Sequence, residues 1–278
     1  MKLLVNLLCC FVPSKKWRKA IKRKLFGTNS RRKRLIAHGC TIENEVLTTP
    51  EGVKVDISNV PHEALGITKE VFLHKDYGII FSFESILIDI GLNRGIASLF
   101  FAKYPNIQKI YGYEPFKPTF ELAKRNLELN PSLSEKINAY NFGLGKTETT
   151  LELPYIDQAT GGMSTTHDVC KDFKNIRTET VIIKDVAKEF FSILEENKNK
   201  RVIVKCDCEG AEFDIFERLN ENGIFEKIDL IMMEYHFDSP EKLTNILAEN
   251  GFAIQVKSSS SKSKTGYIYA VRTAERIC

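Results

Sequence analysis

Short apolar runs alternate with amphipathic segments through the chain after residue 84. Runs such as Ile86–Ile88 and Val202–Cys206 are typical of strands that are buried on both faces of a parallel sheet. Segments such as Lys117–Asn130 place apolar residues on one helical face and predict helices that cover a sheet. Because strand and helix alternate at least six times, the pattern predicts an α/β fold with a doubly wound sheet.

The same pattern gives the expected order of elements after residue 84. We expect strands at 86–88, 110–113, 137–142, 147–153, 179–183, 202–206, 230–234, 253–256 and 267–271, and helices at 96–103, 117–130, 186–196, 211–219 and 240–250. The last two strands are joined by the turn-like segment Ser258–Gly266 and predict an antiparallel hairpin at the end of a mostly parallel sheet.

The pattern is weaker over residues 35–84. Val53–Ile57 alternates like a short strand after the turn Pro50–Gly52, and Val71–His74 is expected to form another. We expect a small β-rich lead-in over 35–84 that covers part of the active site, and a main domain over 85–278.

Charge separates residues 1–34 from the rest of the chain. Twelve of the 40 Lys and Arg residues lie in this segment and none of the 36 acidic residues does, so the arm carries +12 and the remaining chain −8. The apolar stretch Leu3–Val12 is too short to cross a bilayer core of about 30 Å as a helix. Trp17, Ile21 and Leu25 then fall on one face of a basic amphipathic segment.

This arm is typical of segments that bind the surface of an anionic membrane, where each Lys or Arg contributes about 1 kcal/mol. Two other interpretations stay open. The arm can pack on the domain as a helix with solvated lysines, or contact nucleic-acid phosphates, although the second leaves Leu3–Val12 unexplained. The location that we expect is the cytoplasm, peripheral to the inner face of the cell membrane. The seven cysteines form no CxxC pair and agree with a reducing compartment.

A glycine-containing turn follows the first buried strand. Its sequence, Asp89–Gly95, has the spacing DxGxxxG, which differs from the dinucleotide fingerprint GxGxxG. Gly91 allows a sharp turn, and Gly95 allows a close backbone approach. A zwitterionic amino-acid moiety needs no pyrophosphate cradle, so the spacing favours S-adenosylmethionine, with Asp89 and Asn93 near its methionine portion.

Two further residues extend this predicted cofactor site. Glu114 ends the second strand, 25 residues after Asp89, where a carboxylate can accept hydrogen bonds from both ribose hydroxyls. Asn141 ends the third strand and, with Phe142–Gly145, is expected to border the adenine. Ligands of open α/β sheets bind beyond the carboxyl ends of the strands, which is where these residues fall.

Acidic residues gather at the ends of two later strands. Asp207, Glu209 and Glu212 follow the strand 202–206, and such a concentration of carboxylates is costly unless they are paired or used. Glu234 and His236 end the strand 230–234. We expect Asp207, Glu209 and His236 to be catalytic, with one of them as general base toward a hydroxyl. Alternatively, Asp207, Glu209, Glu234 and His236 hold a divalent cation that lowers the pKa of that hydroxyl.

In five segments the chain resembles the FkbM family of methyltransferases, over roughly residues 70–272. The segments are 89–95 (DIGLNRG), 113–115 (YEP), 141–145, 204–212 (VKCDCEGAE) and 233–236 (MEYH). The resemblance implies a class I, Rossmann-like methyltransferase that uses S-adenosylmethionine for O-methylation, often of sugar or polyketide hydroxyls. Arg94 departs from the family, which usually has a small or apolar residue there; a cation at this position would alter the mouth of the pocket.

Together with the basic arm, the resemblance predicts methylation of a sugar hydroxyl in a bacterial surface-glycan precursor. The expected partners are a glycan or glycolipid acceptor and an anionic membrane surface. Two alternatives remain, namely an RNA methyltransferase that uses the basic arm and a non-enzymatic binding protein with the same fold. Intact Asp89, Gly91, Gly95 and Glu114 argue against the second.

Overall fold

The computed structural model describes residues 28–79, 82–157, 160–167, 169–170, 176–260 and 263–273. The chain divides into two compact units, Met1–Asp76 and Tyr77–Cys278. The predicted boundaries at residues 34 and 84 differ from this division. Most of the basic arm, residues 1–27, lies outside the described residues, so its membrane role stays a prediction.

The first unit combines helices with a small antiparallel sheet. Residues 28–37 are helical, so this helix runs across the predicted boundary at residue 34. The sheet has the order β1 (Thr41–Glu43), β2 (Val46–Thr48) and β3 (Lys54–Asp56). Helix α3 (Pro61–Thr68) follows and leads directly into the π-helix η1 (Lys69–His74). Leu35, Leu47 and Leu65 of this unit are buried.

One expected strand of this unit is wrong. β3 confirms a strand within Val53–Ile57, but Val71–His74 is helical because α3 continues into η1 without a break. The neighbouring side chains of Val71 and Phe72 are both buried, whereas in a strand they would point to opposite faces. The helical segment ends at Lys75, whose φ of 54° is left-handed.

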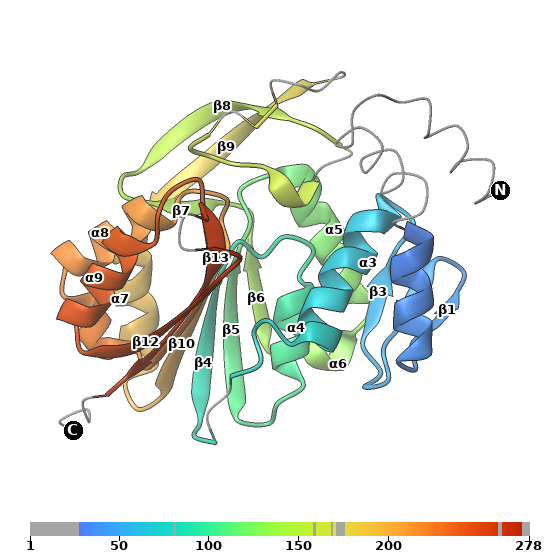
Figure 1. Ribbon diagram of the computed structural model, residues 1–278, viewed down its shortest axis with the longest axis horizontal. Helices are drawn as coiled ribbons and strands as arrows, with labels where there is room; N and C mark the ends of the chain where they lie inside the picture. The colour runs from blue at the N-terminus through green and yellow to red at the C-terminus, as the bar shows by residue number, and fades with distance from the viewer. Residues whose placement is uncertain are drawn as a thin grey trace. The chain divides into compact units, whose positions relative to one another are not determined.

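The second unit is built on a seven-stranded sheet with the order β12-β13-β11-β10-β4-β5-β6. Its strands are β4 (Ser85–Ile90), β5 (Ile107–Tyr113), β6 (Ile137–Tyr140), β10 (Arg201–Cys206), β11 (Leu230–His236), β12 (Phe252–Ser258) and β13 (Thr265–Arg272). β13 pairs antiparallel with β11 and β12, and the other neighbouring strands pair in parallel. The predicted sheet and its closing hairpin are therefore confirmed (Figure 1).

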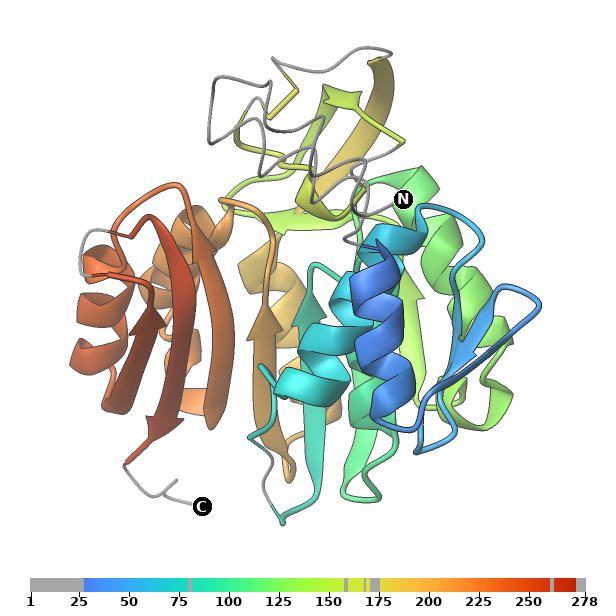
Figure 2. The same ribbon diagram turned by 45° about the vertical axis from the view of Figure 1, so that its right-hand side comes forward.

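Helices cover both faces of this sheet (Figures 1 and 2). One face carries α7 (Val186–Glu196), α8 (Glu212–Glu221) and α9 (Glu241–Glu249), and the other carries α4 (Ile96–Ala102), α5 (Lys117–Glu128) and α6 (Pro131–Ser134). Ile86 and Ile88 of β4 belong to the same buried cluster as Phe190 of α7 and Phe216 of α8. All six residues of β4 are buried, which explains why its run Ile86–Ile88 is apolar without alternation.

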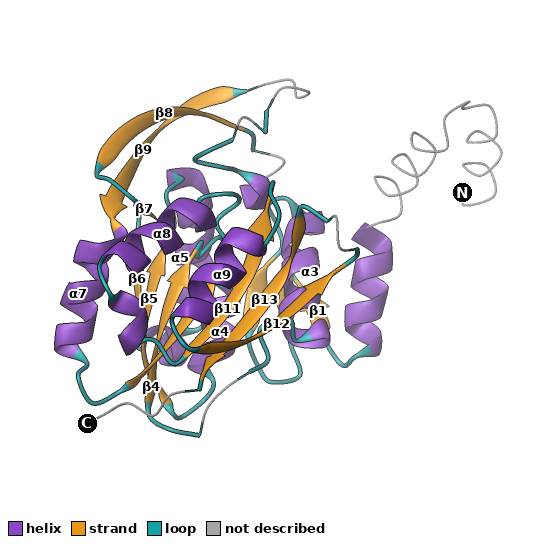
Figure 3. Ribbon diagram, turned by 60° about the vertical axis from the view of Figure 1, so that its left-hand side comes forward, coloured by secondary structure: helices purple, strands orange, loops and turns teal. Residues whose placement is uncertain are grey.

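A second sheet lies beyond the carboxyl ends of the parallel strands. It has the order β7-β9-β8, formed by Gly143–Gly145, Arg177–Asp185 and Thr149–Tyr155, and Figure 3 shows β8 and β9 above the main sheet. The strands predicted at 147–153 and 179–183 are confirmed as β8 and β9. Between them, the short 3-10 helix η2 (Thr160–Gly162) brings Met163–His167 to the same end of the sheet. This is the end at which ligands bind in open α/β folds.

Candidate active site

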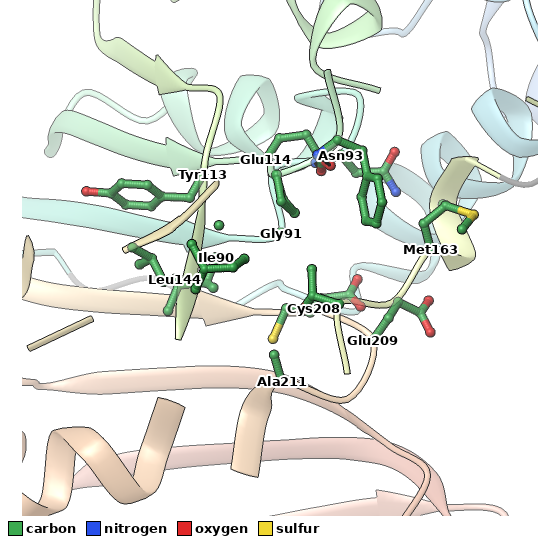
Figure 4. A pocket seen from close by; sticks show the side chains of 17 residues that line it. Ile90, Gly91, Asn93, Tyr113, Glu114, Leu144, Met163, Cys208, Glu209 and Ala211 are labelled. Carbon is green, nitrogen blue, oxygen red and sulfur yellow. Dashed lines mark hydrogen bonds between the residues drawn. The ribbon is translucent and has the colours of Figure 1, made fainter. Parts of the chain in front are cut away.

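A cavity opens at the carboxyl ends of β4, β5 and β10, the edge of the sheet at which open α/β folds bind small molecules. The described residues that line it all belong to the second unit and include no Lys or Arg. They are Ile90, Gly91, Asn93, Tyr113, Glu114, Pro115, Phe116, Gly143, Leu144, Gly161, Met163, Thr165, Ile183, Asp207, Cys208, Glu209 and Ala211 (Figure 4). These residues offer hydrogen-bond acceptors to a ligand.

Gly91 brings the turn after β4 into direct contact with the turn after β10. Its φ is 84°, and a Cβ atom at this position would lie 1.8 Å from the carbonyl oxygen of Asp207. Only glycine therefore fits here. The predicted cofactor turn and the predicted catalytic turn are two walls of one cavity because of this close approach.

Asp89 lies beneath this turn and not in the cavity lining. Its fully buried carboxylate contacts Lys205 Nζ at 2.9 Å and accepts a hydrogen bond from Ser98 Oγ at 2.6 Å. Lys205 also donates to the carbonyl oxygen of Gly91 at 2.6 Å. Burial by itself lowers the pKa of Lys205, but the charges of Asp89 and Asp207 outweigh it and raise that pKa. The ion pair of Asp89 and Lys205 thus stabilises the turn that contains Gly91. Direct contact of Asp89 with a ligand stays a prediction.

Glu114 lies at the cavity wall, at the end of β5 (Figure 4). Its two oxygens accept hydrogen bonds from the backbone amides of Asn93, at 2.9 Å, and Phe116, at 3.0 Å. These bonds fix the carboxylate between the two strand ends. Burial raises the pKa of Glu114 to about 7, although both hydrogen bonds oppose the change. Each oxygen keeps a second lone pair for a ligand hydroxyl.

The two asparagines of the predicted cofactor site differ in position. Asn93 lines the cavity in a left-handed conformation, with a φ of 52°, and its Oδ1 atom is buried without a hydrogen-bond partner. Asn141 does not line the cavity. Its Nδ2 atom donates to the carbonyl oxygens of Glu114 and Pro115 at 3.0 and 3.3 Å, so it supports the strand end, while Gly143 and Leu144 form the wall.

Gly95 and Arg94 also lie outside the lining. Gly95 begins α4 with a φ of 70°, and a Cβ atom there would make only ordinary contacts with Ala123 and Leu127. The left-handed backbone conformation, and not a lack of space, therefore favours glycine at position 95. Arg94 is 1 % exposed, and its carbonyl oxygen accepts a hydrogen bond from Asn126. Arg94 does not line the cavity itself, and an effect of its cation on the mouth of the pocket stays a prediction.

Asp207 follows β10 directly and lines the same cavity as Glu114. β10 ends at Cys206, as predicted, and Asp207 and Glu209 lie in the turn that follows it. Asp207 Oδ2 accepts a hydrogen bond from the buried phenol of Tyr77 at 3.0 Å. Burial and the charge of Asp207 raise the pKa of Tyr77, which keeps this phenol a donor.

Glu209 occupies an uncommon backbone conformation in this turn, with a φ of 52°. The segment after η2 supports it, because Ser164 Oγ donates to the carbonyl oxygen of Glu209 at 2.5 Å. Ser164 Oγ also accepts hydrogen bonds from the backbone amides of Thr166 and His167, at 3.2 and 3.0 Å. The ring of His167 stacks on Phe237 at 4.2 Å between centroids, beside Gly210.

His236 ends β11 and lies among carboxylates. Its Nδ1 atom forms a 2.8 Å hydrogen bond with Glu212, whose side chain is fully buried at the start of α8. Its Nε2 atom lies 3.7 Å from carboxylate oxygens of both Glu209 and Glu234. Burial by itself lowers the pKa of His236, but the bond to Glu212 and the charge of Glu209 raise it overall. Burial also raises the pKa of Glu209.

The structure therefore brings most of the predicted site residues to one cavity. Asp207, Glu209 and His236 each place one potential metal-ligand atom within 4.8 Å of the others, whereas Glu234 lies outside this group. Sequence reasoning gave no role to Tyr77 and Ser164, which hold Asp207 and Glu209. Tyr77 is 130 residues from Asp207, and no local pattern connects them. Lys205 was visible as a charge inside a buried strand, which is a signal that it has a buried partner.

The mostly parallel sheet, the glycine turn after β4 and the acid that ends β5 define a class I, Rossmann-like methyltransferase. The family model described as "Methyltransferase FkbM domain" matches residues 89–254, more than half of the chain. The chain belongs to the FkbM methyltransferase family and is an S-adenosylmethionine-dependent methyltransferase.

Two curated proteins and one crystal structure are similar to this chain. "Methyltransferase 1" of Beauveria bassiana is 30% identical over 207 residues, which cover 69% of this chain and 82% of that protein. "Methyltransferase sdnD" of Sordaria araneosa is 28% identical over 206 residues, covering 63% and 78%. A crystal structure of Methyltransferase FkbM from Methylobacillus flagellatus is 12% identical, with a TM-score of 0.48, and covers 91% of this chain and 60% of that chain.

Proposed function

We propose that this methyltransferase transfers a methyl group to a hydroxyl oxygen, and that the acceptor is a sugar. The observation that carries the proposal is the position of Asp207 and Glu209, two carboxylates on the wall of the cavity that faces the predicted cofactor residues. A hydroxyl is a weak nucleophile, and a neighbouring carboxylate assists by taking its proton.

The cavity fits the methyl donor that the family uses. Glu114 offers lone pairs for ribose hydroxyls, and the buried Oδ1 atom of Asn93 is an acceptor without a partner, which suits an ammonium group. Gly91 keeps the strand end open to a ligand, and Gly143 and Leu144 provide an apolar wall. S-adenosylmethionine supplies a methyl group that is already electrophilic, so the protein contributes mainly by positioning the acceptor.

On the acceptor side we assign three roles. Asp207 and Glu209 accept the hydroxyl hydrogen bond, and one of them takes the proton. His236 lies between Glu212, Glu209 and Glu234 and keeps the carboxylates close together.

The proposal that the acceptor belongs to a bacterial surface glycan has less support than the proposal that it is a sugar hydroxyl. It depends on the basic arm, most of which lies outside the described residues, and the two curated relatives come from fungi. Among the helices that the structure describes, none is long and apolar enough to cross a membrane. Peripheral attachment through residues 1–34 remains part of the proposal.

The test is methyl transfer from isotope-labelled S-adenosylmethionine to a panel of free and nucleotide-linked sugars. The expected product is an O-methyl ether, identified by mass spectrometry and NMR. Asp207→Asn and Glu209→Gln should lower kcat by about 100-fold or more, in the range of general-base contributions, without weakening S-adenosylhomocysteine binding. Glu226→Gln changes an exposed carboxylate elsewhere and serves as the control. Methylation at nitrogen or carbon, or full activity in both variants, would contradict the proposal.

A further inference from the structure

Three side chains bring potential metal ligands to one point at the edge of the cavity. One atom each of Asp207, Glu209 and His236 lies within 4.8 Å of the other two. Asp207 and Glu209 come from the turn after β10, whereas His236 comes from the end of β11. Ligands from two neighbouring strand ends can close on a cation through small side-chain rotations.

The orientation of His236 is independent support. Its side chain is only 10 % exposed, and its Nδ1 atom is occupied by the fully buried carboxylate of Glu212 at 2.8 Å. This bond directs Nε2 toward Glu209 and Glu234, whose oxygens lie at 3.7 Å, too far for hydrogen bonds. A histidine that binds a metal commonly donates its other ring N–H to a carboxylate, which fixes the ring orientation.

The negative charge around the Nε2 atom of His236 also favours a cation at this point. Glu209 and Glu234 have side chains that are only 23 % and 22 % exposed, and Asp207 lies on the same wall. The ammonium of Lys205 is already bound to Asp89 and to the carbonyl oxygen of Gly91. Partly buried carboxylates at this density are stabilised by positive charge between them, which the protonated ring of His236 supplies when no metal is bound and a divalent cation supplies in its place.

We propose that Asp207, Glu209 and His236 bind one divalent cation, with Glu212 as the positioning residue that orients His236. Two carboxylates and one imidazole form a mixed oxygen and nitrogen set, which suits Mn²⁺. The Asp207 oxygen that Tyr77 does not bind is available for this purpose.

The role of this cation rests on the proposed transfer to a hydroxyl. A bound divalent cation lowers the pKa of a coordinated hydroxyl. The acceptor proton then passes to a neighbouring carboxylate, and the new carbon–oxygen bond forms as the methyl–sulfur bond of the donor breaks. The cation is neither oxidised nor reduced, so no further reactant is required.

Titration of the full chain with Mn²⁺, followed by the EPR signal of the free ion, tests the site without any methyl transfer. We expect one bound Mn²⁺ per chain at pH 8. His236→Gln and Glu209→Gln should weaken binding by at least about 10–100-fold, and Glu212→Gln by a similar factor, because loss of an orienting carboxylate has effects of that size. Glu226→Gln is the matched control and should leave binding unchanged. Circular dichroism confirms that each variant is folded.

Binding of S-adenosylhomocysteine, measured on the same samples, separates this inference from the proposed function. If S-adenosylhomocysteine binds but Mn²⁺ stays free at millimolar concentration, the cation site is wrong. Equal Mn²⁺ affinity in the folded His236→Gln and Glu209→Gln variants would also overturn it. If Mn²⁺ binds as expected but no sugar hydroxyl is methylated, the site stands and the proposed function fails.

Discussion

At the scale of single residues, Gly91 connects the two halves of the site. Its backbone is left-handed, and a Cβ atom would meet the carbonyl oxygen of Asp207 at 1.8 Å. The left-handed conformation and the close contact each disfavour a side chain at residue 91, and each has its own energetic cost. The left-handed conformation alone costs a non-glycine residue about 1–2 kcal/mol, whereas the contact requires the two turns to move apart.

We therefore expect Gly91→Ala to lower the free energy of unfolding by more than about 3 kcal/mol, beyond the conformational cost alone, and to abolish S-adenosylhomocysteine binding. Gly223→Ala is the matched control, because Gly223 has a φ of 65° and nothing within 4 Å of its Cβ position. It should lose only about 1–2 kcal/mol. Urea unfolding measures both, and equal losses in the two variants would mean that the close approach to Asp207 is unimportant.

Glu114 gives a pH dependence at the same scale. Its pKa is raised to about 7 by burial, so the carboxylate is largely protonated at pH 6 and ionised at pH 8. Only the ionised form offers both oxygens purely as acceptors to ribose hydroxyls. Calorimetry with S-adenosylhomocysteine should show affinity rising by about tenfold from pH 6 to pH 8. A constant or falling affinity over this range would reject the ribose contact.

At the scale of elements, the loop after η2 supports the turn after β10. Ser164 is 3 % exposed, and its hydroxyl connects the Glu209 carbonyl to the amides of Thr166 and His167. Ser164→Ala leaves these groups without that partner, and we expect the Glu209 turn to relax. The carboxylate of Glu209 would then leave the position from which it acts on the acceptor.

The expected result for Ser164→Ala is a fall in kcat of about tenfold or more, in the range seen for residues that orient others. S-adenosylhomocysteine affinity should change by less than about twofold, because Ser164 does not line the cofactor side of the cavity. Ser134→Ala removes an exposed serine hydroxyl that bonds only locally and serves as the control. Loss of stability with an unchanged kcat would show that Ser164 has a structural role only.

Most elements of the second unit could be predicted from the sequence because their burial is periodic. The run Ile86–Ile88 of β4 is apolar since helices cover both faces of the strand, and α7 begins and ends at the predicted residues. Val71–His74 was misassigned because a short apolar run has no period that separates strand from helix. The strand predicted at 202–206 ends where β10 ends, but the positive φ of Glu209 and Gly210 in the turn that follows could not be read from periodicity.

The site was less predictable than the fold. Asp207, Glu209 and Glu114 line the cavity as strand-end reasoning requires. Asp89 and Asn141 stand at strand ends but do not line the cavity, because their side chains are directed to Lys205 and to the backbone of Glu114. Gly95 lies just before α4, and its Cα faces Ala123 and Leu127 of α5. Position along a strand places a residue at the edge of the sheet but does not give the direction of its side chain.

At the scale of the whole molecule, the basic arm is the part that the cavity does not explain. Full-length protein should sediment with vesicles that contain phosphatidylserine. Replacing Lys15, Lys16, Arg18 and Lys19 by Gln should remove about 4 kcal/mol of binding, at about 1 kcal/mol per charge. Salt at 1 M should have a similar effect, because it shortens the screening length to about 3 Å. Equal sedimentation of both proteins at low salt would reject attachment through the arm.

The central claim is that the carboxyl ends of β4, β5 and β10 form an S-adenosylmethionine site with Glu114 at its wall. Isothermal calorimetry with S-adenosylhomocysteine at pH 8, on the wild-type chain and on Glu114→Ala, tests it most directly. The account predicts one binding site per chain and an affinity that falls by about 100-fold in the variant, as expected for two hydrogen bonds to a charged group. No binding to the wild-type chain, or equal affinity in the folded variant, would contradict it.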